Sequence, residues 1–157
     1  MLNQVAPLPL KDPSLFRQAN YLNGAWVEAD SGESITVRNP ATGEAVGSVP
    51  NMGAAETRRA IEAAYAAYPA WRAMLAKERS AILRKLSDLM LANAEDLAVI
   101  MTAEQGKPLT ESKGEIVYAA SFIEWFAEEG KRIYGDTIPQ NAKGRRIVVT
   151  KEPIGVF

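Results

Sequence analysis

The 157-residue sequence contains no cysteine and no histidine. Disulfide bonds and cysteine-based zinc sites are therefore excluded from this chain, as are catalytic arrangements that pair a histidine with serine or cysteine. The lack of cysteine is compatible with a reducing compartment. Any reactive thiol or imidazole that the protein uses would have to come from outside these residues.

Long apolar runs and an excess of one charge are also missing. No stretch approaches the roughly 18 apolar residues that a membrane span needs, and the N-terminus has no charged start followed by an apolar block, as a secretory signal would. Lys and Arg total 18 against 19 Asp and Glu, which gives no electrostatic reason to bind nucleic acid or an anionic membrane. We expect a cytoplasmic protein without nucleic-acid or membrane partners.

Motifs for phosphate binding and acid–base chemistry are absent as well. No G-x-G-x-x-G follows a strand, and Gly53 precedes a helix without the lysine of a P-loop. The adjacent carboxylates Glu95-Asp96 and Glu128-Glu129 fall on predicted helices, where neighbours point to different faces. We predict that both pairs are solvated surface charge.

The composition that remains is that of a folded domain, with 47% hydrophobic and 24% charged residues. Its first part reads as strands. Asn23-Gly24 is the strongest two-residue signal for a β-hairpin and separates residues 21–22 from residues 26–27. Further short strands are predicted at Ser34–Arg38 and Ala45–Val49, with a turn between them.

The middle of the chain reads as helices. Pro69 is expected to break the first helix. Gly106 is expected to end the helix that precedes residue 106, and Pro108 to begin the last helix, which runs to about Tyr134. A strand at 145–151 and the start of an apolar extended run at 154–157 follow. The predicted helices before Pro108 span residues 57–68, 70–75, 78–91 and 94–103.

The last predicted helix carries two apolar stripes. One is made of Ile116, Ala119, Ala120, Ile123 and Ala127, and the other of the aromatic residues Tyr118, Phe122 and Trp125. A helix that is apolar on most of its circumference must be covered on most sides. One chain of this length offers little cover, so we expect it to fold marginally or with help from other chains.

Several motifs together resemble the aldehyde dehydrogenase superfamily, over about residues 14–157. They are Leu22-Asn23-Gly24 with Trp26, the turn at 39–44 (NPATGE), residues 104–108 (EQGKP), Glu115 with residues 118–131, residues 134–136 (YGD) and residues 152–156 (EPIGV). The run at 122–129 (FIEWFAEE) is similar to the succinate-semialdehyde dehydrogenase branch.

This resemblance implies an α/β fold and a division of the chain. Residues 1–13 themselves read as a flexible arm, and the resemblance implies the strand-plus-helix part of the cofactor-binding domain at 14–139. Residues 140–157 would hold a strand of the oligomerisation sheet and the start of the next strand, ending before the Rossmann-type sheet. The chain would then be the N-terminal third of an enzyme that works as a homodimer or homotetramer.

The same resemblance implies the chemistry of the parent enzyme. A cysteine thiolate would attack a small aldehyde, hydride would pass to NAD or NADP, and water would release the acid. The residues for these steps follow Phe157 in the family. The 157 residues alone would therefore be non-catalytic and would not bind the cofactor.

Two sets of site residues follow from the resemblance. Tyr118 and Phe122 fall where the family's helix lines the aldehyde tunnel; the alternative is that both are ordinary core. Backbone carbonyls of Val37 and Arg38 with the carboxylate of Glu104 fall where some members hold a monovalent cation, for which oxygen ligands are suited. The alternative is that Glu104 is a helix-end carboxylate that accepts hydrogen bonds from nearby backbone N–H groups.

Three functions remain open from the sequence. The first is oxidation of succinate semialdehyde in 4-aminobutyrate degradation, and the second is oxidation of glutarate semialdehyde or another short aldehyde. The third belongs to a different class, a non-catalytic interaction or assembly module, and its support is the lack of any reactive group.

Overall fold

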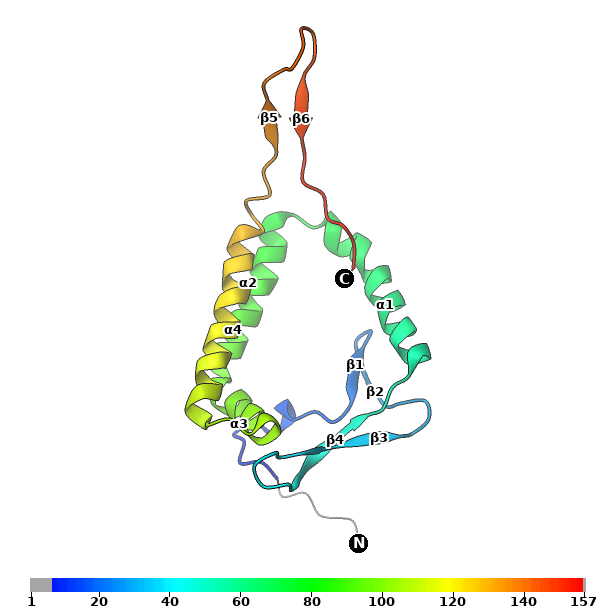
Figure 1. Ribbon diagram of the computed structural model, residues 1–157, viewed down its shortest axis with the longest axis vertical. Helices are drawn as coiled ribbons and strands as arrows, with labels where there is room; N and C mark the ends of the chain where they lie inside the picture. The colour runs from blue at the N-terminus through cyan, green and yellow to red at the C-terminus, as the bar shows by residue number, and fades with distance from the viewer. Residues whose placement is uncertain (1–6, 157) are drawn as a thin grey trace.

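The computed structural model describes residues 7–156. It is a mixed α/β structure, as predicted, in which helices form the long sides of an open frame (Figure 1). Its elements are the 3₁₀ turn η1 (Pro13–Leu15), strands β1 (Asn20–Leu22), β2 (Ala25–Val27), β3 (Ser34–Arg38) and β4 (Ala45–Pro50), helices α1 (Ala54–Ala73), α2 (Ala76–Ala92), α3 (Ala94–Gln105) and α4 (Leu109–Glu129), and strands β5 (Asp136–Ile138) and β6 (Ile147–Val149).

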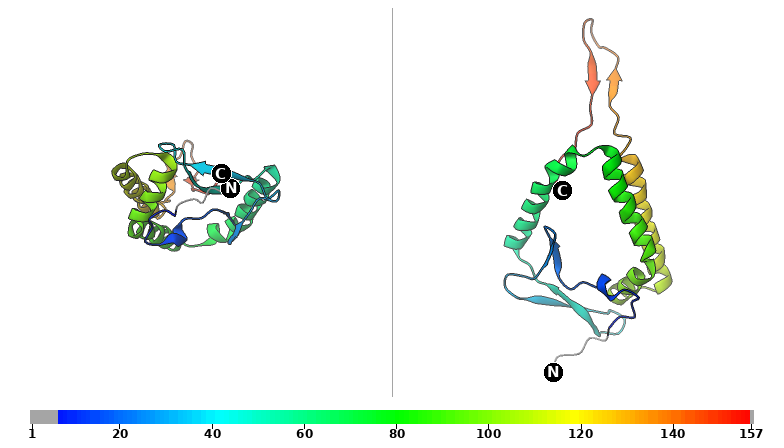
Figure 2. Two further views of the ribbon diagram at one scale, coloured as in Figure 1. Left: turned by 90° about the horizontal axis from the view of Figure 1, so that it is seen from below. Right: turned by 180° about the vertical axis from the view of Figure 1, so that it is seen from behind.

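The strands form antiparallel two-stranded ladders at opposite ends of the frame. The β1–β2 and β3–β4 hairpins lie at one end, and the β5–β6 hairpin projects from the other (Figures 1 and 2). Helix α1 stands on one side, and α2, α3 and α4 pack together on the other. Among the described residues, no helix is both long enough and apolar enough to cross a membrane.

The predicted β1–β2 hairpin is confirmed. Asn23 and Gly24 both have positive φ, 48° and 84°, as a tight two-residue hairpin turn requires. The register pairs Tyr21 with Trp26, and their rings meet edge to face at 5.3 Å. The turn chemistry therefore sets the register, and the aromatic pair reinforces it on one face.

The β3–β4 hairpin is also present, with a bulge between Val37 and Arg38. Its turn is closed by the side chain of Asn39, which accepts a hydrogen bond of 2.9 Å from the Ala41 N–H, and by Gly43 at φ 76°. The turn chemistry of the Asn-Pro-Ala-Thr-Gly segment thus ends β3 and returns the chain to β4.

The prediction that Pro69 breaks the first helix was wrong, because α1 continues through it to Ala73. Proline removes one hydrogen bond to the carbonyl of residue 65. Tyr65 and Pro69 are both exposed, so water can satisfy that carbonyl. The separate helix expected at 70–75 is accordingly the last turn of α1.

Small side chains pack α4 against its two neighbours. Ser112, Ala120 and Ala127 of α4 are each at most 1% exposed to solvent. The Ser87 hydroxyl of α2 donates to the Ala120 carbonyl at 3.0 Å, and the hydroxyls of Thr102 and Ser112 are 2.8 Å apart. These small residues allow the helices to approach closely, and each buried hydroxyl is hydrogen-bonded. We call this interface the small-residue seam.

The C-terminal part differs from the sequence prediction in two ways. Helix α4 ends at Glu129, before Tyr134, and Gly130 follows it, where glycine raises the entropic cost of continuing the helix. The strand expected at 145–151 is confirmed in its centre as β6, and its partner β5 was not predicted. An alanine Cβ at Gly135 would lie 2.1 Å from the Val149 carbonyl oxygen, so glycine permits the segment before β5 to approach the end of β6 at the base of the hairpin.

The prediction that Asp96 is solvated was wrong. Asp96 is only 5% exposed, although the Glu95-Asp96 pair was expected to be solvated. Its carboxylate accepts hydrogen bonds from the backbone N–H groups of Lys11 and Asp12 at 3.0 and 2.8 Å. The last residues of the expected arm at 1–13 are therefore held against α3, and its residues 1–6 lie outside the described part.

Candidate functional site

The aromatic stripe of α4 is exposed on one side of the frame. Tyr118 and Phe122 are 64% and 46% exposed, and their rings meet edge to face at 4.7 Å. Trp125 and Phe126 continue the stripe and are exposed too. The opposite stripe, with Ile116, faces the neighbouring helices. Tyr118 and Phe122 thus lie outside the core of the described residues.

These aromatic residues line an open groove of about 740 Å³ along α4. Charged side chains of the same helix and the turn after it complete the lining, among them Glu124, Glu128 and Arg132. An apolar wall with charged residues at its rim is typical of a surface that binds a small molecule or another part of a protein.

The carboxylates at the rim are held as ion pairs. Lys131 lies 2.7 Å from Glu128, and its ammonium group lowers the pKa of that carboxyl. Arg132 pairs with Glu129 at 2.7 Å. Glu124 pairs with Arg84 of α2 and raises the pKa of that guanidinium. The Glu128 carboxyl and the Arg84 guanidinium are thereby favoured in their charged forms. The prediction of surface charge for Glu128-Glu129 is consistent with their pairing.

The candidate cation residues come from two elements that touch. Val37 and Arg38 end β3, and Glu104 lies in the last turn of α3. The two elements meet where Pro40 packs on Gly106, since a Cβ at Gly106 would lie only 2.6 Å from the Pro40 Cγ. Gly106 has φ 81° and its N–H donates to the Thr102 carbonyl, which ends α3. β3 and the end of α3 are therefore neighbours, and the cation site at Val37, Arg38 and Glu104 stays a prediction.

The local hydrogen bonds bear on the alternative for Glu104. Among residues 7–156, no backbone N–H donates to its carboxylate, which is exposed. Arg38 donates from Nη1 to the Gly43 carbonyl at 3.0 Å, so its side chain braces the hairpin turn. Within the described part of the chain, no group of three or more acidic side chains is placed to hold a metal. A cation here would depend on backbone carbonyls.

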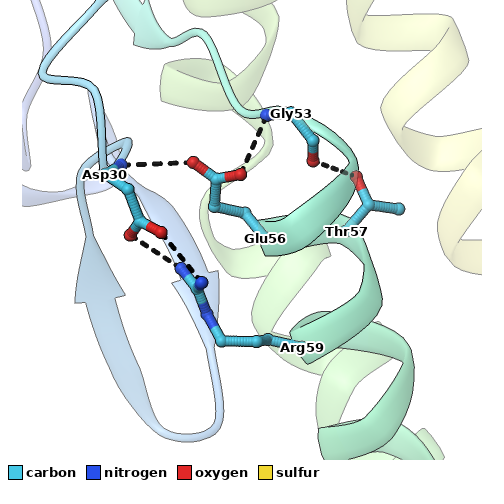
Figure 3. A network of polar contacts seen from close by, with 5 residues as sticks. All are labelled: Asp30, Gly53, Glu56, Thr57 and Arg59. Atoms are coloured by element: carbon cyan, nitrogen blue, oxygen red, sulfur yellow. Dashed lines mark hydrogen bonds and ion pairs between the residues drawn. The ribbon is translucent and has the colours of Figure 1, made fainter.

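One polar network was missed by sequence reasoning. The carboxylate of Glu56, in the first turn of α1, accepts from the Asp30 N–H at 3.2 Å and from the Gly53 N–H at 3.1 Å (Figure 3). Arg59 donates twice to the Asp30 carboxylate, at 2.8 and 2.7 Å. This network, the Glu56 clamp, joins the segment after β2 to the N-terminus of α1. A Glu three residues after a cap position was the signal that could have revealed it.

The contacts of the Glu56 clamp shift the pKa values of Glu56, Asp30 and Arg59. Hydrogen bonds from the backbone N–H groups of Glu56 itself, Asp30 and Gly53 lower the pKa of the Glu56 carboxyl. The Arg59 guanidinium lowers the pKa of Asp30, and Asp30 raises that of Arg59. Each group is thereby favoured in its charged form, so the clamp is a structural support.

Comparison with known proteins identifies the fold family. The family model described as "Aldehyde dehydrogenase family" matches residues 26–157, which is most of the chain. The chain belongs to the aldehyde dehydrogenase family.

Its similarity to individual family members is high. The chain is 66% identical over 149 residues to a glutarate-semialdehyde dehydrogenase of Pseudomonas putida. It is 62% identical over 149 residues to an NADP(+) succinate-semialdehyde dehydrogenase of Escherichia coli. In both comparisons the match covers 95% of the chain and 31% of the relative.

A solved structure agrees with this placement. The crystal structure of succinate-semialdehyde dehydrogenase from Burkholderia pseudomallei superposes with a TM-score of 0.91 at 63% identity, covering 94% of this chain and 30% of that one. The chain therefore has the fold of the N-terminal region of an aldehyde dehydrogenase. It spans about a third of the length of the curated relatives that it matches.

Proposed function

We propose that this chain is the N-terminal framework of an NAD(P)-dependent dehydrogenase that oxidises succinate semialdehyde to succinate in 4-aminobutyrate degradation. The observation that carries the proposal is the identity of 62% with a succinate-semialdehyde dehydrogenase over 95% of the chain. The apolar groove along α4 supports it, because a short aldehyde needs an apolar approach from which water is excluded.

The closest alternative is glutarate semialdehyde, and the identity of 66% with a glutarate-semialdehyde dehydrogenase favours it. The two substrates differ by one methylene between the aldehyde and the carboxylate. An apolar pocket discriminates one methylene by only about 1–3 kcal/mol, so one protein is able to oxidise both. Relative kcat/KM values are therefore the quantity that decides between them.

Within such an enzyme, we assign this chain a supporting role. Its sequence supplies no thiol for nucleophilic attack and no glycine-rich phosphate loop. We propose that the nucleophile and the NAD(P) site belong to other parts of the protein, and that Tyr118 and Phe122 line the path of the aldehyde. In this role their rings narrow the path without taking part in the reaction.

Kinetics of the complete protein that contains this chain test the proposal. Purified protein is assayed with succinate semialdehyde, glutarate semialdehyde and acetaldehyde, each with NAD+ and with NADP+, by the formation of reduced nicotinamide. We expect the highest kcat/KM with succinate semialdehyde and little turnover of acetaldehyde, which lacks a carboxylate. A preference for glutarate semialdehyde would select the alternative substrate.

The 157-residue chain, assayed in parallel, tests the division of roles. We expect no turnover from it with any of these aldehydes. Failure of the complete protein to oxidise any aldehyde would favour the third interpretation, a non-catalytic interaction or assembly module. Light scattering on the complete protein tests its proposed assembly as a homodimer or homotetramer, and cell fractionation tests its proposed cytoplasmic location.

A further inference from the structure

The N-terminal segment crosses between parts of the fold that otherwise touch little. Residues 10–18 pass beside α3 and then run to β1, next to the β3–β4 hairpin (Figures 1 and 2). Apart from this segment, β3 touches α3, and Pro40 of the hairpin turn packs on Gly106 just after α3. We infer that residues 10–18 are a strap that ties the β3–β4 hairpin to α3, and that Asp96 is the residue that fastens it.

The first end of the strap is fastened by a buried charge. Both oxygens of the Asp96 carboxylate are used, one by the Lys11 N–H at 3.0 Å and the other by the Asp12 N–H at 2.8 Å. The Asp12 side chain in turn accepts from the Ser14 N–H at 2.9 Å and begins the η1 turn. A carboxylate that is 5% exposed needs such donors, since an unpaired buried charge is strongly disfavoured.

The other end of the strap is fastened to β4. The Gln18 side-chain oxygen accepts a hydrogen bond of 2.8 Å from the Ser48 N–H. A Cβ added at Gly47 would lie 2.8 Å from that oxygen and 2.9 Å from the Phe16 ring. Glycine at this point of β4 therefore leaves the space that the strap occupies. Arg17 lies over the Trp26 ring, 5.1 Å from its centroid, and adds a contact with β2.

The strap and the Pro40–Gly106 contact hold the same two elements. The hairpin carries Val37 and Arg38, and α3 carries Glu104. If the cation site proposed for these residues exists, the strap fixes the separation of its two halves; the strap itself does not depend on that site.

Hydrogen exchange of the complete protein, read by mass spectrometry of peptides, tests the strap. Asp96→Ala removes both acceptors, so we expect the Lys11 and Asp12 amides, read in peptides that cover residues 10–13, to exchange at least about tenfold faster, since hydrogen bonds to charged groups are among the stronger ones. If the strap couples its two ends, peptides of β4 that include Ser48 also exchange faster. Gln18→Ala should accelerate the β4 peptides only.

Two further variants make the result decisive. Glu95→Gln is the matched control, because Glu95 is adjacent, exposed and paired with Lys113; it should leave residues 10–13 and β4 unchanged. Asp96→Asn keeps the shape and loses the charge, and it should give an intermediate effect. Faster exchange at residues 10–13 without any change in β4 would refute the coupling. Unchanged exchange at residues 10–13, or equal acceleration throughout α3 and α4 in both Asp96 variants, would refute the strap.

Discussion

Replacing Gly106 with alanine tests the contact between the β3–β4 hairpin and the end of α3. Gly106 has φ 81°, a left-handed conformation that costs an alanine about 1–2 kcal/mol. The new Cβ would lie 2.6 Å from the Pro40 Cγ, whereas carbon atoms prefer a separation of about 3.5–4.0 Å. Pro40 must then move, and overpacking of this kind costs about 1–3 kcal/mol.

Gly43 provides a matched control for the same substitution. Its φ is 76°, and no atom lies within 4 Å of an added Cβ. Gly43→Ala therefore carries the same backbone strain, and the same gain of roughly 0.4–1 kcal/mol from a less flexible unfolded chain, without the contact. The difference between the unfolding free energies of the two variants therefore measures the cost of the contact with Pro40, which we expect to be about 1–3 kcal/mol.

Urea unfolding of the two variants and the parent protein, followed by circular dichroism, measures this difference. We expect Gly106→Ala to have the lower midpoint, with an unchanged slope. Equal midpoints for the two variants would mean that Pro40 gives way without cost, and the reasoning from close packing at this junction would be refuted.

Three other predictions concern single side chains. Tyr118→Ala in the complete protein should change the KM for succinate semialdehyde by about twofold to tenfold, the value of one aromatic contact; identical kinetics with normal thermal stability would reject the tunnel role. Glu56 and Asp30 have lowered pKa values in the folded protein, so the unfolded state binds more protons in acid. Stability should therefore fall as pH drops below the ordinary glutamate value of 4.5, and Glu56→Gln should flatten this loss in urea titrations; a parallel pH profile would count against the clamp. Exchanging the sodium salt of the buffer for the potassium salt should raise the melting temperature of the parent protein but not that of Glu104→Gln. A potassium-exchange difference map without density beside Glu104 would contradict the cation site.

Local chemistry made much of this fold predictable. Asn23-Gly24 specifies a hairpin through its own backbone preferences, and the hairpin is present with the expected turn. Helix α4 was predicted with two stripes; the structure buries Ile116, Ala120 and Ala127 of the first, leaves Ala119 exposed and Ile123 half-buried, and exposes the stripe with Tyr118. Periodicity reveals that a helix has two apolar sides, but it does not reveal which side its neighbours cover.

The errors arose where distant residues or solvent decide the outcome. Asp96 was predicted to be solvated because adjacent carboxylates on a helix point to different faces; its donors are 84 and 85 residues away. Pro69 was predicted to end a helix, but its exposed position lowers the cost of the lost hydrogen bond. Strand β5 is three residues long and has no periodic pattern of its own, so only its pairing with β6 defines it.

The candidate site was less accessible to sequence reasoning than the fold. Tyr118 and Phe122 were named through a resemblance, because aromatic residues at helical spacing are as typical of a core as of a pocket wall. The Glu56 clamp had a local signal in its capping pattern, yet its second half, Asp30, lies on a separate segment. The strap likewise joins residues far apart in the sequence, Lys11 with Asp96 and Gln18 with Ser48.

The small-residue seam limits how this protein can change over evolutionary time. Ser112, Ala120 and Ala127 are at most 1% exposed, so a larger side chain at any of them would press on its surroundings and push α4 away from its neighbours. A larger side chain on α4 is tolerable only after a neighbouring position on α2 or α3 has become smaller. Viable descendants should therefore alter these positions in pairs, and a deep mutational scan would record them as intolerant singly but permissive in compensating combinations.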